Sequence, residues 1–349
     1  MKKTIVSIVR LLAIGALAGG FVLGAAADEP RWSGWQFQGE NDALALFSGS
    51  DEHYTNGIRF AMVRNPKNNP DWVGSFHEWY CARFCGRQAY RSTLGWSFGQ
   101  NLFTPDDISI ETLIPDDRPY AAVLYGSLFV DFIDDHETVK QTVELQIGIV
   151  GPEAGGEWLQ TEFHELIDDE LPQGWDNQLA FEPIVNLNYR HENRVILVGD
   201  KSLGLANVDV IPQWGFGFGN LMTRFNLGGT LRLGWNIGGF PQADIVNVFG
   251  GGSERDVRKK FEAYVFVGAE GRAVLRNLML DGNTFKDSHH VDKRPGVYDL
   301  RGGFFVRYEK WQFNYTFVSR SQEFDPARGD HDGRHDYGSF TLSCVIPVR

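Results

Sequence analysis

Apolar and polar residues alternate with a period of two along much of the chain, as expected for β-strands whose two faces meet different surroundings. Leu227, Leu231 and Leu233, for example, fall on one face of a run, while Thr230 and Arg232 fall on the other. Counting such runs predicts about twelve strands, an even number as in bacterial membrane barrels. The predicted strands span residues 35–46, 54–64, 89–100, 120–133, 139–150, 182–198, 205–216, 222–236, 260–274, 297–308, 311–322 and 336–348.

Alternation alone fits either a soluble β-sandwich or a transmembrane β-barrel. Three features favour the barrel: the polar faces carry bulky charges of both signs, such as Asp299 and Arg301; aromatic residues cluster at strand ends; and an export signal precedes the domain. The aromatic residues are Trp35, Trp96, Trp214, Trp235, Tyr298, Tyr308 and Trp311. We therefore predict an all-β fold, an antiparallel twelve-stranded transmembrane barrel of the bacterial outer membrane, with an interior that side chains can largely fill.

Residues 1–27 are predicted to be a cleaved signal peptide. Lys2, Lys3 and Arg10 form a basic start, an apolar stretch follows at 11–22, and three alanines precede the cleavage point. The mature domain is then residues 28–349, with no visible internal boundary. The net charge of the whole chain is −12, and loss of three basic residues makes the mature protein more acidic, which argues against nucleic acid as a partner.

No later segment has the roughly 18 uninterrupted apolar residues of a spanning helix, so any membrane must be met by strands. Cys81 and Cys85 lie four positions apart, and export allows a disulfide between them. A small loop staple fits this pair better than a metal site, because no histidine arrangement accompanies it.

The residue pattern in the connection at 151–179 predicts a short helix. It opens with Gly151 and Pro152, and residues 158–167 then show a helical pattern in which Leu159, Phe163 and Leu166 share a stripe. If the first strand runs outward from the periplasm, this connection and the first hairpin both lie at the extracellular end. The sequence therefore predicts a helix in an extracellular loop, near the polar residues of the first hairpin.

Polar residues gather at that hairpin. Strand parity puts Asn41 and Asn56 on the outward face and Asp42 and Thr55 on the inward face, so Asp42 and Thr55 could share a site across the hairpin. These residue types also form turns, and a purely structural role stays open.

His164 is the best candidate for a general base, because a neutral imidazole can take a proton from water; a surface histidine without function is the alternative. No Gly-x-Ser-x-Gly elbow occurs, so water is the simpler nucleophile. The oxygen atoms of Asp42, Thr55 and Glu170 suit calcium, although their spacing matches no dedicated calcium loop.

These residues resemble those of a known family, the outer-membrane lipid A 3'-O-deacylases of Gram-negative bacteria. The resemblance spans most of the mature chain, and the stretch from Gly151-Pro152 to His164 is its most specific part. It rests on Asn41-Asp42, on residues 54–57, on 148–170 and on 174–179. It implies a twelve-stranded barrel with a site between the wall and a loop helix at the extracellular rim, ester hydrolysis of lipid A, and dependence on calcium.

Carried over residue by residue, the resemblance implies a catalytic site of Asn41, Asp42, Thr55, His164 and Glu170. His164 would activate water, and Ca²⁺ held near Asp42 and Glu170 would stabilise the oxyanion. Glu182 is the next carboxylate to test, and Arg118 could meet a substrate phosphate, since residues 104–117 lack the family's lysine.

The resulting hypothesis is an outer-membrane carboxylic ester hydrolase that removes the 3'-acyloxyacyl group from lipid A of lipopolysaccharide. A monomer is expected. Two alternatives remain: a phospholipase-type outer-membrane esterase, and a non-enzymatic channel or structural barrel whose rim residues are only turn formers. The acyl position, the oligomeric state and latency in the native membrane stay open.

Overall fold

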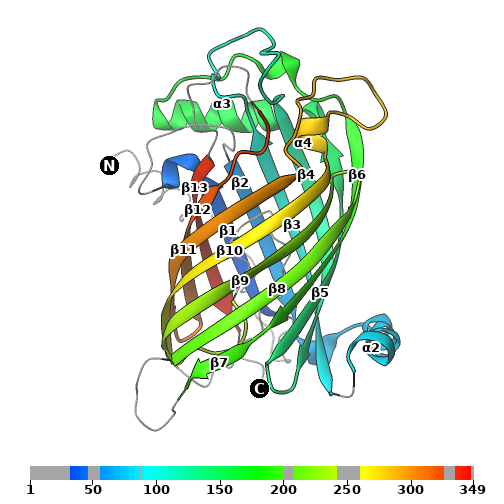
Figure 1. Cartoon of the computed structure of the whole chain (residues 1–349), viewed down its shortest axis with the longest axis vertical. Coiled ribbons are helices and arrows are strands. Elements are labelled where there is room, and N and C mark those ends of the chain that lie inside the picture. The colour runs from blue at the N-terminus through cyan, green and yellow to red at the C-terminus, as the bar shows by residue number, and fades with distance from the viewer. Residues whose placement is uncertain are drawn as a thin grey trace.

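One antiparallel sheet closes on itself to form a barrel (Figure 1). The computed structural model describes residues 32–45, 56–86, 88–199, 207–241, 260–325 and 335–346. The strands are β1 (Trp32–Asn41), β2 (Asn56–Arg64), β3 (Tyr90–Phe103), β4 (Ala121–Asp134), β5 (Val139–Val150), β6 (Glu182–Asn193), β7 (Val195–Val198), β8 (Asn207–Gly219), β9 (Met222–Trp235), β10 (Phe261–Asn277), β11 (Gly296–Tyr308), β12 (Trp311–Arg320) and β13 (His335–Val345). Sequential neighbours pair except for β6 and β7, which both pair with β8, and the β1–β13 and β6–β8 pairings complete the closure.

Twelve strands span the wall in the described part of the chain, because the short β7 continues β6. Both pair with β8 in one register, with Glu192 opposite Gln213 and Val195 opposite Val210. The single strand predicted at 182–198 is therefore interrupted near Arg194 without a change of register. The predicted twelve-stranded antiparallel barrel is confirmed.

The alternation of the sequence separates the outer face from the lumen, as predicted. Leu227, Leu231 and Leu233 are exposed on the outer face, whereas Thr230 and Arg232 are buried inside. An exposed apolar band of this kind is the surface that a barrel presents to lipid.

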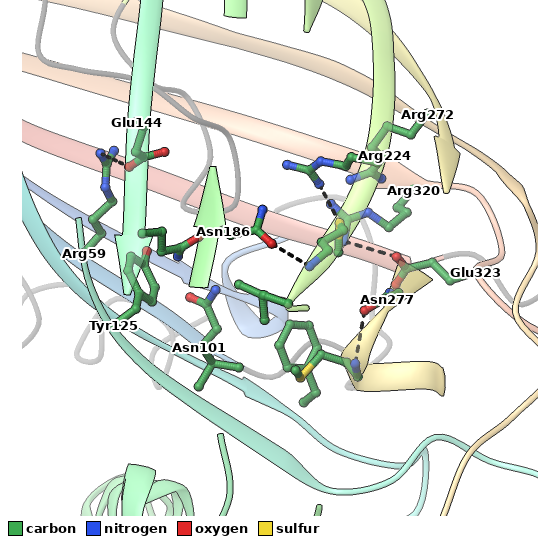
Figure 2. A pocket seen from close by; sticks show the side chains of 16 residues that line it. Arg59, Asn101, Tyr125, Glu144, Asn186, Arg224, Arg272, Asn277, Arg320 and Glu323 are labelled. Carbon is green, nitrogen blue, oxygen red and sulfur yellow. Dashed lines mark hydrogen bonds and ion pairs between the residues drawn. The ribbon is translucent and has the colours of Figure 1, made fainter. Parts of the chain in front are cut away.

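Ion pairs fill the middle of the lumen. Arg232 Nη2 lies 2.6 Å from Asp209 Oδ2, and Asp299 accepts hydrogen bonds from Arg272 at 2.6 Å and from Arg320 at 2.9 Å. Such pairing is what buried charges require. Figure 2 shows the cavity of about 60 Å³ that remains, and its lining includes Arg59, Asn101, Val123, Tyr125, Glu144, Arg224, Arg272 and Glu323.

Apolar side chains close the lumen on both sides of these ion pairs. Toward one end a layer is built from Phe103, Val123, Val150, Ile184, Leu278, Met279, Val318 and Tyr337. Toward the other end Ile133, Ile211 and Phe240 meet, beside a second cluster that contains Tyr264 and Phe305. The described residues therefore leave the barrel plugged.

Helices lie at both ends of the wall. They are η1 (Asp42–Leu44), η2 (Pro66–Asn68), α2 (Asp71–Phe84), η3 (Pro152–Ala154), α3 (Gly156–Ile167), η4 (Trp175–Asn177) and α4 (Leu278–Asp281). No helix of the described residues has the length and apolar character to cross a membrane. With β1 running outward from the periplasm, α3 and α4 lie at the extracellular end and α2 at the periplasmic end (Figure 1).

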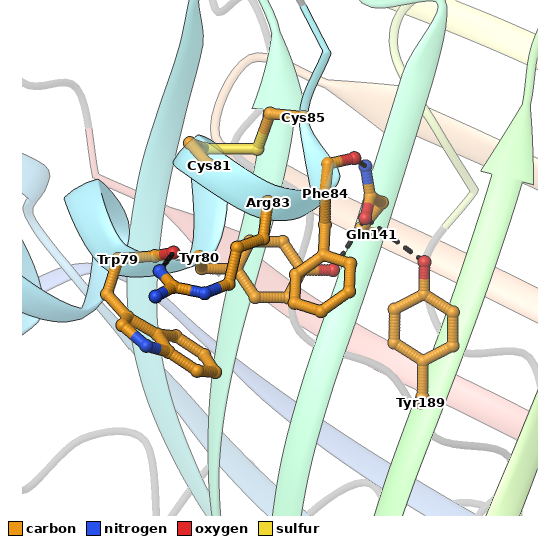
Figure 3. Close-up of a disulfide and its surroundings, with 8 residues drawn as sticks. All are labelled: Trp79, Tyr80, Cys81, Arg83, Phe84, Cys85, Gln141 and Tyr189. Atoms are coloured by element: carbon orange, nitrogen blue, oxygen red, sulfur yellow. Dashed lines mark hydrogen bonds between the residues drawn. A yellow bond between two sulfur atoms is a disulfide. The ribbon is translucent and has the colours of Figure 1, made fainter.

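The helix α2 was not predicted from the sequence. It fills the connection between β2 and β3, and the disulfide between Cys81 and Cys85 closes its last turn (Figure 3). The pairing that export allowed is thus present in the structure, and Cys344 is a buried free thiol.

Candidate active site at the rim of the barrel

Residues that lie opposite one another on neighbouring strands form a row across the wall close to α3. Asn41 lies opposite Asn56 on β2 and opposite Gly338 on β13. Asn56 lies opposite Leu102 on β3, and Leu102 lies opposite Ala122 on β4. Opposed residues point to the same side of a sheet, and the chain neighbours Asn101 and Val123 line the lumen cavity, so the whole row faces outward. The outward orientation predicted for Asn41 and Asn56 agrees with this register.

The chain leaves the wall directly after Asn41, because η1 begins at Asp42. The backbone of Leu44 rests on Gly338, where an added Cβ would overlap the Leu44 carbonyl oxygen, and Tyr315 Oη donates a 2.8 Å hydrogen bond to the same oxygen. The first strand therefore ends at Asn41 and not at residue 46. The parity argument for Asp42 assumed that the strand continues through residue 42, and this premise was wrong, because η1 begins there; Asp42 itself is buried.

The helix α3 begins against the other end of the row. A Cβ at Gly156 would lie 2.5 Å from the Cβ of Ala122. One turn later, Gln160 Oε1 accepts a 2.8 Å hydrogen bond from Trp175 Nε1. The indole of Trp175 is itself buried, with 2% of its surface exposed, and packs in a tilted arrangement against the Tyr120 ring, with 5.0 Å between the ring centres. Burial raises the pKa of Tyr120 to about 12, so the phenol stays neutral.

A short turn before α3 sets its direction. Gly155 has φ 71°, a left-handed conformation that side chains disfavour, and it links η3 to the helix. Gln100, on the outer face of β3, donates a 2.6 Å hydrogen bond from Nε2 to the Ala154 carbonyl. The sequence signalled this turn only through the Gly155-Gly156 pair, and neither Gln100 nor Trp175 was singled out.

The buried side of α3 is polar. Gly156, Gln160 and His164 are spaced by four residues and all three are buried, whereas Leu166 is 52% exposed. The apolar stripe of Leu159, Phe163 and Leu166 therefore does not define the docking side of the helix.

His164 is held by the turn that ends α3. Asp168 adopts φ 57°, and the Asp169 amide donates a 3.0 Å hydrogen bond to the His164 carbonyl. This turn brings the Glu170 carbonyl oxygen to His164 Nδ1, with which it forms a short hydrogen bond. A carbonyl oxygen can only accept, so Nδ1 is the donor, and in the neutral imidazole the lone pair is then on Nε2. The contact from Glu170 is thus made by its backbone, while its side chain is exposed.

The remaining candidates lie elsewhere or outside the described residues. Thr55 falls outside them. Glu182 accepts hydrogen bonds from Asn220 Nδ2 at 2.8 Å and from the Thr284 amide at 2.7 Å, so it ties loops together at the mouth of the lumen.

Arg118 is buried, with 1% of its surface exposed, and its Nη1 lies 3.8 Å from Glu323 Oε2. Burial lowers the pKa of Arg118, and the negative charge of Glu323 opposes that effect. A side chain enclosed in this way is not presented to a substrate phosphate at the rim.

The donor set at the rim suits a hard cation. In the part of the chain that the structure describes, no three His, Cys, Asp or Glu side chains are grouped to hold a metal ion. Asn41, Asp42 and Glu170 nevertheless offer amide, carboxylate and carbonyl oxygens, which calcium accepts, and no thiolate for a softer metal. The residues present therefore fit calcium better than zinc.

A closed antiparallel barrel with an exposed apolar wall, a charged and plugged lumen and a helix laid over its outer rim is an outer-membrane barrel with a candidate site that faces the membrane. The family model of outer membrane protein LpxR matches residues 11–346, so the chain belongs to that family and is an outer-membrane protein. This confirms the family resemblance drawn from the sequence.

A solved structure shares this fold. The structure of LpxR from Salmonella typhimurium superposes with a TM-score of 0.69 at 20% identity, covering 90% of this chain and all (100%) of that one. The β domain of the Bordetella autotransporter BrkA has a TM-score of 0.41 at 9% identity, covering 90% of this chain and 99% of that one. No curated protein matches the sequence.

Proposed function

We propose that the protein is a lipid A deacylase, a hydrolase that removes an ester-linked acyl chain, the 3'-acyloxyacyl group, from lipopolysaccharide. The observation that carries this proposal is the state of His164. Its Nδ1 is committed to the Glu170 carbonyl, so a basic Nε2 remains on the buried, wall-facing side of a helix outside the barrel.

Helix geometry supports a site that His164 shares with the polar rim. Eight residues separate His164 from Gly156, which is about 12 Å along an α-helix. Three strand spacings separate β4 from β1, which is about 14 Å. The helix starts against Ala122 of β4 and lies at the end of the barrel where β1 ends and β2 begins (Figure 1). We infer that its length is sufficient for His164 to reach the rim that carries Asn56 and Asn41.

The position of this rim favours a membrane lipid as substrate. The site lies on the outer face of the wall, and α3 adds Trp158, 67% exposed, and Leu166, 52% exposed, to the lipid-facing surface. An acyl chain can therefore reach the rim without leaving the leaflet. The apolar layers across the lumen argue against the alternative of an open channel.

The chemistry assigned to these residues is hydrolysis by a water molecule. His164 Nε2 takes a proton from water while the water oxygen bonds to the ester carbonyl carbon. The bond between the carbonyl carbon and the sugar oxygen then breaks, and the imidazolium gives its proton to this leaving oxygen, which yields the sugar hydroxyl and a free fatty acid. Asn41 and Asn56 present amide groups along the same rim and would orient the ester. When bound by Asp42 and Glu170, Ca²⁺ would supply a Lewis acid for the ester carbonyl.

The test is the His164→Ala variant, measured by mass spectrometry of lipid A from cells that express it. We expect deacylation to fall by about 10²- to 10⁴-fold, the usual contribution of a general base. His136→Ala is the matched control, because His136 is exposed in a turn at the opposite end of the barrel, and electrophoretic heat shifts verify that both barrels fold.

Full deacylation by His164→Ala would refute the role of His164. Release of fatty acid from phospholipids, with lipid A unchanged, would instead identify a phospholipase.

A further inference from the structure

The helix α2 packs against the outside of the wall and not across its opening. Its buried residues Val73 and Tyr80 cluster with Leu94, Val130 and Phe132. These wall residues alternate with lumen residues such as Asp131, which pairs with Lys140, so they belong to the lipid-facing side. The helix therefore occupies space that would otherwise hold lipid.

Specific contacts fix α2 there (Figure 3). The Tyr80 ring stacks on Phe132 at 4.1 Å, and its hydroxyl donates a 2.5 Å hydrogen bond to Gln141 Oε1. Tyr189 donates a second hydrogen bond to that oxygen at 3.0 Å, and Gln141 Nε2 donates to the Phe84 carbonyl at 3.4 Å. Burial raises the pKa of Tyr80, which keeps the phenol protonated as a donor.

The apolar sector of α2 extends beyond the residues that contact the wall. Trp72 and Trp79, seven residues apart, share one flank, and Phe84 lies on the other; they are 47%, 50% and 57% exposed. The guanidinium of Arg83 lies 4.9 Å from the Trp79 ring. The helix sector turned away from these residues carries polar side chains, Asp71, Ser75 and Glu78. Exposed aromatic residues beside a polar face are typical of a helix in a membrane interface.

The aromatic belt of the barrel continues into α2. Gln141 lies in one row with His191 and Trp214. Trp214 is 38% exposed on the lipid-facing side and stacks at 5.5 Å on His191. Tryptophan and tyrosine concentrate at the two interfaces of membrane barrels.

Strand length places α2 and α3 at the two boundaries of the membrane. Along β4, α3 contacts Ala122 and α2 contacts Phe132, ten residues further on. Ten residues extend about 33 Å along a strand. With a tilt of about 40° this becomes about 25 Å along the membrane normal, the height of the apolar band of such barrels.

We propose that α2 is an interfacial anchor that inserts Trp72, Trp79 and Phe84 into the boundary between headgroups and acyl chains of the phospholipid leaflet, on the side opposite α3. By fixing the depth of β4 at this boundary, α2 also sets the height of the α3 rim in the other leaflet. This inference does not depend on the hydrolase activity.

Brominated phospholipids test it in vesicles that contain only the full-length protein and phosphatidylcholine. Bromine quenches tryptophan fluorescence on contact. The emission of the wild type minus that of the double variant Trp72→Phe/Trp79→Phe gives the signal of these two indoles. We expect bromines near the headgroup to quench this difference signal more than bromines at the bilayer centre, and aqueous iodide to quench it least.

Trp235→Phe is the matched control, because Trp235 is 55% exposed on the outer face of β9 at the same end. The emission of the wild type minus that of Trp235→Phe shows how a wall residue in contact with lipid responds to each quencher. If the double variant does not show the heat shift of a folded barrel, the single variant Trp79→Phe provides the difference signal.

Strong quenching by iodide without quenching by either bromolipid would overturn the proposal and leave this face to a protein partner. Stronger quenching by the deep bromines would overturn it as well, because an interfacial helix does not reach the bilayer centre.

Discussion

Two helices, α2 and α3, pack on the outside of the same strand from opposite ends of the barrel, yet their buried sides differ in chemistry. The buried side of α2 is aromatic and apolar, with Tyr80 stacked on Phe132. The buried side of α3 carries two polar side chains, those of Gln160 and His164. Apolar burial suffices to dock a helix, whereas burial of polar groups costs free energy unless each is hydrogen-bonded. The comparison supports the proposals that α2 is an anchor and that α3 covers a reactive site.

After His164→Ala, the largest effect is expected from Asp42→Asn at the rim. Loss of the carboxylate removes a ligand of the proposed calcium ion, and deacylation should fall on the order of 10²- to 10³-fold. Hydrolysis of lipid A in detergent, with and without a chelator, measures this. Glu165→Gln removes an equal charge from the exposed side of α3 and should retain activity. Wild-type activity that is indifferent to the chelator would contradict the calcium proposal.

Gly338→Ala should disturb the same rim without touching a reactive group. The new Cβ meets the Leu44 carbonyl and displaces η1, which carries Asp42. Since a displacement of about 1 Å can cost about 10²-fold in rate, we expect a loss of roughly 10- to 10²-fold. Gly296→Ala is the control, because nothing lies within 4 Å of a Cβ there. Equal activity of the two variants would mean that η1 does not position Asp42.

Trp175→Phe should loosen α3 and lower activity less than the rim variants. The Gln160 amide oxygen loses a buried donor, which costs about 1–3 kcal/mol of docking free energy. Hydrogen exchange should then accelerate in residues 156–167, with a smaller decrease in activity. Trp158→Phe replaces the exposed tryptophan of the same helix and should change neither the exchange rate nor the activity. Unchanged exchange in Trp175→Phe would show that α3 is held by other contacts.

The smallest effect is expected at α2. Tyr80→Phe removes one hydrogen bond to Gln141 but leaves the stacking on Phe132, so unfolding in urea should become easier by about 1 kcal/mol. Lipid A hydrolysis should stay at the wild-type level. A decrease in activity comparable to that of Trp175→Phe would show that α2 is coupled to the site and is more than an anchor.

Local sequence patterns predicted the strands of the barrel wall but not the residues at which all of them end. Alternation located β5 and β9 almost to the residue, because lipid on one side and charges on the other impose a period of two. It failed at Asp42, where the strand ends, because nothing local to Asp42 shows that Leu44 will fold onto Gly338, nearly 300 residues away in the sequence. It also missed α2, because the segment was interpreted only through Cys81 and Cys85, as a small loop closed by a disulfide.

The sequence alone determined the two-faced strands, the exported barrel and, through resemblance, the family; His164 and the outward Asn41 were also within its reach. Tertiary structure decided which face of α3 is buried, that Glu170 meets His164 through its backbone, and that Arg118 is enclosed beside Glu323. The physical reason is that alternation is a local property of each strand, whereas closure of the sheet brings distant segments together. Pairing within the sheet places α3 against Ala122 of β4, and closure brings Gly338 of β13 beside Asn41 of β1.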